Sequence, residues 1–382
     1  PSQAPIQPLK PDLKNFDTLI STEYSLREIN LMEEEIPEGL ECVIIAGPTE
    51  RLSDYDLFKI DQFLMKGGSL ALFLDSHSIY LPQGSQYGQS QEPAYIPKNT
   101  GLEELLAHYG ITLERSFVLD EESYKQQQRG ANGGIVETPV YYAPIITDEQ
   151  ISDDLRFMAN IPQLITLYAA PLHVNESLSA ALTARAVFSS SEDSWAMSED
   201  INLTYPQLIQ PPPDDMQEQM VLAYVLEGTF DSYFAGRDAP APEQADRPES
   251  DAAGAQSIST DNLQVTQDVI ESGSGTIFVM GTSAILGSNV LEPEARSGNA
   301  LFMLNLMDYL NSNEDNAVMR TKGISYVPLG DTTPQRRSFI KTFNIAILPV
   351  LVIVIGIFVW VGRMSRRKRI ESLFTTESDH GE

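Results

Sequence analysis

Cysteine is almost absent from this sequence. Cys42 is the only one in 382 residues, which excludes an internal disulfide, a CxxC metal site and a pair of redox-active thiols. It lies in the apolar run 42–46, where a cysteine usually behaves as a small buried hydrophobic residue. Such a chain suits the cytoplasm or a bacterial periplasm equally well.

Basic residues are also scarce. Lysine and arginine number 25 against 54 aspartates and glutamates, which gives a net charge of −29. A surface of this sign repels the phosphates of nucleic acids, so we predict no nucleic-acid partner. Two explanations of the acidity stay open: solubility, or an acidic binding face.

Signatures of catalysis are missing too. No GxxxxGK[ST] string is present, so the chain lacks the phosphate-binding loop of an ATPase. An amidotransferase needs a cysteine at a tight strand-to-helix turn with a histidine base, whereas Cys42 begins an apolar strand. The histidines show no metal-ligand spacing; they are His77, His108, His173 and His380. We therefore predict a protein that is not an enzyme and holds no cofactor or metal.

Charge is absent from one long run near the C-terminus. The 21 residues 342–362, between Lys341 and Arg363, contain no charged side chain. A helix of this length spans roughly 30 Å, the thickness of a bilayer core. The alternative, a buried helix of a soluble protein, is rarely apolar on every face for so long. We predict a transmembrane helix, with Pro349 as a kink and Trp360 near the membrane interface.

A basic cluster follows this span, and it sets the predicted orientation. Its members are Arg363, Arg366, Arg367, Lys368 and Arg369. The positive-inside rule places residues 363–382 in the cytoplasm, and the bulk of the chain on the periplasmic, extracytoplasmic side of the inner membrane. The cluster serves either as a stop-transfer anchor or as a contact for anionic lipid or an ATPase partner. Because the chain starts with Pro1, we expect an upstream targeting or membrane segment.

The rest of the chain predicts one interrupted domain. Four prolines mark residues 1–15 as a linker, and the α/β domain is expected over 16–320. Residues 237–262 have almost no large apolar side chain and predict a flexible loop. The part after this loop is too small for a core of its own. Residues 321–341 are expected to form a juxtamembrane segment.

Strands alternate with helices in the first third of the domain. Residues 42–46 and 70–74 predict buried strands, and between them Ser53 and Asp56 begin a helix that ends at Gly67-Gly68. A second helix starts near the Thr100/Glu103 capping box, and a third strand is expected at 117–119. Later segments add a strand at 276–280 and a helix at 297–310, whereas 121–160 predicts an irregular excursion or lid. The pattern indicates an α/β fold with a mostly parallel sheet and flanking helices.

The sequence Asp75-Ser76-His77 follows the second predicted strand and is the best candidate ligand site. Ligands of open α/β sheets bind at the carboxyl ends of the strands. The alternative is a polar loop in which Asp75 caps a turn.

An ordered set of segments resembles one protein family. "IPEGLECVIIAGPTERLSDYDLFKIDQFLMKGGSLALFLD" (36–75), "GLEELLAHYGITLERSFVLD" (101–120) and "LFMLNLMDYLNSNED" (301–315) resemble the GldG-like gliding-motility auxiliary proteins of ABC-type transport systems. Arg320-Thr321-Lys322 is similar to the short basic element of the family, and a last transmembrane helix with an arginine cluster closes both. A GDSDF-like acidic string of the family is replaced here by Gly281-Thr282-Ser283-Ala284-Ile285.

The resemblance implies a non-catalytic auxiliary subunit that accompanies an ABC permease and an ATPase at the lipid bilayer. It also implies a domain related to the class I glutamine amidotransferases, within the broader flavodoxin-like class. Two alternatives remain: an extracytoplasmic ligand-binding or sensor module, and an amidotransferase-like hydrolase.

Overall fold

A computed structural model describes residues 8–81, 93–129, 135–176, 178–241, 268–321 and 334–375. The chain divides into two compact units, residues 1–326 and 327–382. Most of the predicted flexible loop 237–262 lies outside the described residues, as does most of the predicted juxtamembrane segment.

The first unit is built on a mixed five-stranded sheet. Its order is β1 (Cys42–Ala46), β2 (Ser69–Phe73), β14 (Ser272–Met280), β13 (Val221–Asp231) and β11 (Leu182–Ser189). The first three strands are parallel, whereas β13 and β11 join antiparallel. The expectation of a mostly parallel sheet is therefore wrong for β13 and β11. A parallel pair needs a crossover, usually an α-helix, and among the described residues no α-helix lies between β11 and β13 or between β13 and β14.

The strand–helix–strand unit at the start of the sheet is confirmed. Ser53 caps α2 (Asp54–Met65) by accepting a hydrogen bond from the Asp56 amide at 3.1 Å. The chain turns at Gly67, whose φ of +95° is costly for any residue with a Cβ, and enters β2 beside β1. Local capping and turn chemistry therefore determine this crossover.

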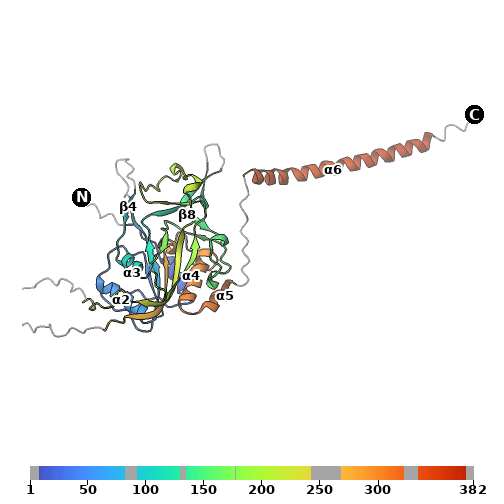
Figure 1. Cartoon of the computed structure of the whole chain (residues 1–382). Coiled ribbons are helices and arrows are strands. Elements are labelled where there is room, and N and C mark those ends of the chain that lie inside the picture. The colour runs from blue at the N-terminus through green and yellow to red at the C-terminus, as the bar shows by residue number, and fades with distance from the viewer. Residues whose placement is uncertain are drawn as a thin grey trace, which may run out of the picture. The chain divides into compact units, whose positions relative to one another are not determined.

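Helices cover both faces of the sheet (Figure 1). α2 and α3 (Leu102–His108) pack on one face, and α1 (Lys14–Ile20), α4 (Gly298–Leu310) and α5 (Glu314–Thr321) lie on the other. The predicted helix 297–310 is confirmed, with Ser297 as its N-cap. Nearly every residue of α4 is buried, because α1, α5 and the sheet surround it.

Smaller sheets occupy the long insertion between β2 and β14. They are β3 (His77–Tyr80) with β4 (Ala94–Pro97), β5 (Ile111–Leu113) with β10 (Leu172–Val174), β6 (Phe117–Asp120) with β12 (Ser194–Met197), and β7 (Ser123–Arg129) with β8 (Ile135–Ile146) and β9 (Leu164–Ile165). The predicted strand 117–119 thus exists but pairs outside the central sheet. The stretch 121–160 is not irregular: β7 and β8 form an antiparallel pair.

Residues 8–15, predicted as part of a linker, contact the folded unit. The Leu9 amide donates to the Ile79 carbonyl at 2.7 Å, and the Asn15 side chain donates to the Leu291 carbonyl at 2.8 Å. Residues 8–15 are therefore held against the folded unit by hydrogen bonds.

The second unit contains the long helix α6 (Pro334–Thr375). Within it, Phe339–Arg367 is long and apolar enough to cross a membrane: its most apolar 18 residues have a mean hydropathy of 2.9 and no buried side chain. The predicted span 342–362 lies inside this segment, and the helix runs through Pro349.

Candidate functional site

Asp75 lies directly after β2, at the carboxyl end of the parallel strands. Its Oδ1 accepts the Ser283 amide at 2.6 Å, and its Oδ2 accepts the Ser283 hydroxyl and the Lys98 ammonium, both at 2.8 Å. Lys98 is buried, so Asp75 supplies the opposite charge that its ammonium needs. The carboxylate therefore joins three segments: the end of β2, the residue after β4 and the loop after β14.

Ser76 and His77 turn to a different set of neighbours. The Ser76 hydroxyl donates to the Ser116 carbonyl at 3.0 Å and lies 2.9 Å from His77 Nδ1. The buried His77 ring packs on Phe117 with 5.0 Å between ring centroids. Burial, assisted by the positive charge of Arg115, lowers the pKa of His77. Binding of a ligand by these three residues stays a prediction.

Close packing leaves little room beside the Asp75 carboxylate. A Cβ placed on Gly47, at the end of β1, would lie 2.5 Å from Ser283 Oγ and 3.1 Å from Asp75 Oδ2. Asp75 was predicted from the sequence, whereas Lys98 was not, and Ser283 was named only as part of the string that replaces the acidic motif of the family. No local pattern could have found them, because they lie 23 and 208 positions from Asp75.

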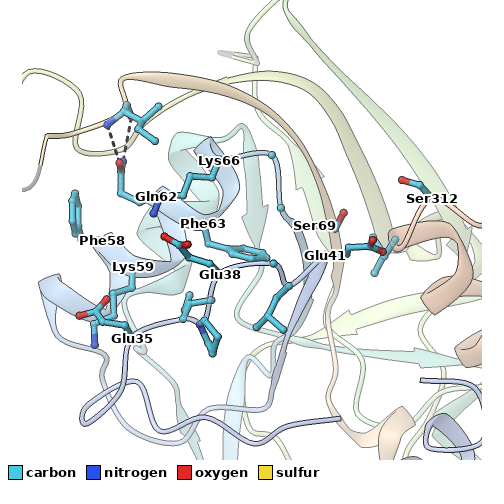
Figure 2. A pocket seen from close by; sticks show the side chains of 18 of the residues that line it. Glu35, Glu38, Glu41, Phe58, Lys59, Gln62, Phe63, Lys66, Ser69 and Ser312 are labelled. Atoms are coloured by element: carbon cyan, nitrogen blue, oxygen red, sulfur yellow. Dashed lines mark hydrogen bonds between the residues drawn. The ribbon is translucent and has the colours of Figure 1, made fainter. Parts of the chain in front are cut away.

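A groove of about 590 Å³ lies at the opposite, amino end of β1 and β2 (Figure 2). Its walls are the segment 35–41, the second half of α2 and the start of β2. Figure 2 shows Glu35 beside Lys59 at one end of the groove and Glu41 beside Ser69 at the other.

The charge of this groove is negative. Four exposed carboxylates line it, those of Glu35, Glu38, Glu41 and Asp268, against one exposed lysine, Lys66. The buried Lys59 contributes little positive potential, because its ammonium lies 3.3 Å from Asp56 Oδ1 and 3.2 Å from the Glu34 carbonyl. The C-terminal end of α2 adds partial negative charge. The groove therefore favours a cationic occupant over an anionic one.

A second hollow of about 870 Å³ lies between the β7–β8 pair and the start of α4. Tyr142 and Tyr168 line it, and their rings stack with centroids 4.9 Å apart. Tyr168 has a φ of +53°, which is an unusual conformation for an aromatic residue. A hydrogen bond from its backbone amide to the Tyr142 carbonyl, at 3.0 Å, helps to hold this conformation. This hollow presents aromatic and amide side chains.

The surroundings of Cys42 and of the described histidines do not favour a reactive nucleophile or a metal site. Burial raises the pKa of the Cys42 thiol to about 12, which disfavours the reactive thiolate. His108 bonds the Asp231 carbonyl and His173 bonds Glu114, whereas His380 lies outside the described residues. In the part of the chain that the structure describes, no three or more His, Cys, Asp or Glu side chains gather in a way that could hold a metal ion.

The fold and helix α6 define a class: a mixed α/β unit joined to a helix of membrane-spanning length. Residues 8–305 match the family model described as "ABC-type uncharacterized transport system". The chain therefore belongs to this family of auxiliary components of ABC-type transport systems. No curated protein matches the chain.

One solved structure similar to this chain is titled "mmIFT52 N-terminal domain". The sequence identity is 13%, the TM-score is 0.42, and the match covers 81% of this chain and 93% of the other. A likeness at this level carries no argument about function.

Proposed function

We propose that this protein is a non-catalytic, membrane-anchored auxiliary subunit of an ABC-type transporter, GldG-like in kind. The single observation that carries the proposal is α6: a chain of this transport family contains a helix whose most apolar 18 residues have a mean hydropathy of 2.9 and an exposed apolar surface. An apolar helix surface of this size is stable only when lipid or protein covers it.

Basic residues are more numerous after the apolar segment of this helix than before it, which supports an orientation. Five follow it, from Arg363 to Arg369, and three precede it: Arg336, Arg337 and Lys341. With the five on the cytoplasmic side of the inner membrane, the α/β unit acts on the extracytoplasmic side.

The division of labour in the transporter follows from what the sequence lacks. Without a phosphate-binding loop, the chain depends on a separate ATPase for energy and on a permease for the path through the membrane. Its extracytoplasmic unit is then free to contact the permease or the cargo, and α6 packs against the permease.

Purification from the native host in a mild detergent tests the association. We expect a permease and an ATPase to co-purify with the tagged full chain. Ile353→Arg, which places a charge in the middle of α6, should reduce membrane integration and co-purification, whereas the matched Ser365→Arg at the basic end should not. Isolation of the wild-type chain as a lone monomer would contradict the proposal.

Topology is tested separately with the same chain. We expect protease added to spheroplasts to cut within the predicted flexible loop 237–262 and to leave the tail after Arg363 intact. Cleavage of the tail alone would show that the chain has the opposite orientation.

A second candidate is an extracytoplasmic ligand-binding module. The 870 Å³ hollow favours it, because Tyr142 and Tyr168 offer aromatic surface near the loop that contacts Asp75. A thermal shift of the full chain with a sugar and peptide library, lost in Tyr168→Ala but kept in Tyr205→Ala, would support this module. The Asp75, Ser76 and His77 site is tested in the same screen.

A further inference from the structure

Strand β1 is the outer strand of the central sheet, and its free edge lacks partners. β1 pairs only with β2 among the described residues. All five of its residues are apolar and all are half-buried, although their side chains pack into the two cores on either face of the sheet. The preceding segment, residues 25–40, makes no hydrogen bond with β1.

The register identifies which backbone groups face outward. The Glu41 carbonyl accepts the Ser69 amide and the Gly47 amide donates to the Phe73 carbonyl, so the odd-numbered residues of this segment bond β2. In a parallel ladder the alternate residues direct their N–H and C=O groups away from the partner strand. Cys42, Ile44 and Ala46 therefore present three donors and three acceptors along the free edge, and no described residue bonds them.

The opposite edge of the same sheet is protected. β11 has register irregularities around Phe188, which also forms a bridge with Ile151. The Ser152 amide donates to the Val187 carbonyl, and β11 carries the charged side chain of Arg185. Charges, bulges and covering segments are the devices by which proteins prevent pairing at an edge. β1 has none of these devices within its five residues.

We propose that the β1 edge binds an extended strand of a partner polypeptide, with an apolar centre and basic flanking residues. The strand would extend the five-stranded sheet by bonding Cys42, Ile44 and Ala46. Main-chain hydrogen bonds provide affinity in this mode of recognition, and side chains provide the selection.

Charge complementarity determines the kind of partner. The exposed Glu38 and Glu41 precede β1. The exposed Glu50 follows it, next to the exposed Arg51, whose guanidinium lies 3.9 Å from the Glu104 carboxylate. The groove of Figure 2, which Glu38 and Glu41 line, is continuous with the amino end of β1. Lysine or arginine residues on both sides of the bound strand would meet these carboxylates.

The same charges disfavour a second copy of this chain. In an antiparallel pairing of two β1 strands centred on Ile44, Glu38 of one copy would lie opposite Glu50 of the other. Like charges opposite one another destabilise a strand pair, and a net charge of −29 on each chain adds repulsion. The surface does not depend on α6 lying in a membrane, so its test is independent of the proposed topology.

The primary test measures binding of synthetic nine-residue peptides to the full chain in detergent. One peptide has a Thr-Val-Ile-Val-Thr centre with two lysines at each end, and a matched peptide has glutamates in place of the lysines. We expect the lysine peptide to bind at least about tenfold more tightly at 150 mM salt.

Two versions of the lysine peptide with methylated backbone amides distinguish strand pairing from simple charge attraction. One carries N-methyl groups on both valines, the other on the isoleucine alone. A strand presents alternate amides to its partner, so one peptide should lose at least about tenfold in affinity while the other binds as before. Equal binding of the two would overturn the proposal.

Amide hydrogen exchange locates the site without any mutation. Bound lysine peptide should slow exchange at Cys42, Ile44 and Ala46 and leave Val43 and Ile45 unchanged, because these two already bond β2. Protection elsewhere with none at β1 would overturn the proposal.

Two variants complete the test. Ile44→Pro removes one outward N–H that β2 does not use and should abolish peptide binding, whereas Ile44→Ala, which also loses the packing of Ile44 but keeps the N–H, should still bind. Glu38→Gln with Glu41→Gln should weaken binding of the lysine peptide several-fold, whereas Glu192→Gln with Glu199→Gln, an equal charge change away from β1, should not. Self-association of the wild-type chain that Ile44→Pro abolishes would identify a second copy as the occupant and overturn the proposed partner.

Discussion

The guanidinium of Arg320 lies 2.7 Å from the fully buried carboxylate of Asp308. This contact is an ion pair, whereas Arg320 donates hydrogen bonds to Asn305 Oδ1 at 2.8 Å and to Glu23 at 2.5 Å, and the Tyr24 hydroxyl donates to the other Asp308 oxygen at 2.5 Å. The network connects α4, the end of α5 and the segment after α1. The arginine of the short basic element is thus a structural residue of the core.

Removal of Arg320 should destabilise the first unit strongly. Arg320→Ala leaves the Asp308 charge buried without its cation, which costs about 3–5 kcal/mol when one partner of a buried pair is removed. The measurement is the free energy of unfolding of the full chain in urea. Arg156→Ala serves as the control: its pairs with Glu314 and Asp315 are exposed, so the loss should stay below about 1 kcal/mol. Equal losses in the two variants would contradict this role.

Asp75 should act through stability whether or not a ligand binds beside it. Asp75→Ala removes the counter-charge of the buried Lys98 and two hydrogen bonds to Ser283, so we expect a loss of about 3 kcal/mol. Lys98→Met combined with Asp75→Ala should be less destabilising than the sum of the single changes, as thermal unfolding would measure. Additive effects would show that the two residues are independent; the exposed Lys66→Met controls for loss of a lysine.

The stability of the first unit should fall between pH 6.5 and more acidic values because of His77. Burial lowers the pKa of His77 in the folded chain, so protonation favours the unfolded chain. Its effect is absent well above the ordinary pKa of about 6.5, grows as pH falls from there toward the lowered folded-state pKa, and is constant below that pKa. His77→Phe, which keeps a ring against Phe117, should reduce the difference in unfolding free energy between pH 7.5 and pH 5. An unchanged difference would assign the pH dependence to other groups.

Cys42 should resist alkylation in the folded protein. Its pKa is raised from 9.0 to about 12, which lowers the thiolate fraction at pH 8 roughly a thousandfold, and the thiolate is the reactive species. Iodoacetamide labelling followed by mass spectrometry should be slow in buffer and fast in 8 M urea, with Cys42→Ser as the blank. Labelling of the folded chain at the rate of a free thiol would contradict a buried thiol.

Local chemistry predicted the elements that depend on short segments. The Ser53 cap, the turn at Gly67 and the uniformly apolar run 342–362 each lie within a few residues or within one helix, and each corresponds to a structural element. The sequence could therefore define β1, α2, β2 and α6.

Long-range pairing was beyond this reasoning. The direction of β13 beside β14 depends on the connection between them, and strand patterns alone do not show it. β7 was missed because six of its seven residues are exposed, so the polar run Gln126–Gln128 has no apolar face to reveal a strand. At the candidate site, the partners of Asp75 come from distant segments, and only the folded chain brings them together.

The position of β14 in the sheet has a consequence for how the protein folds. β14 lies between β2 and β13, and the loop after it reaches Asp75 from 208 positions along the chain. During synthesis, β1 and β2 leave the ribosome long before their neighbour does, and their apolar strands stay without a completed sheet for that interval. So long a loop has to close before its contacts form, which slows folding and leaves apolar surface exposed in the meantime. A chain truncated before Ser272, which lacks the strand between β2 and β13, should therefore aggregate.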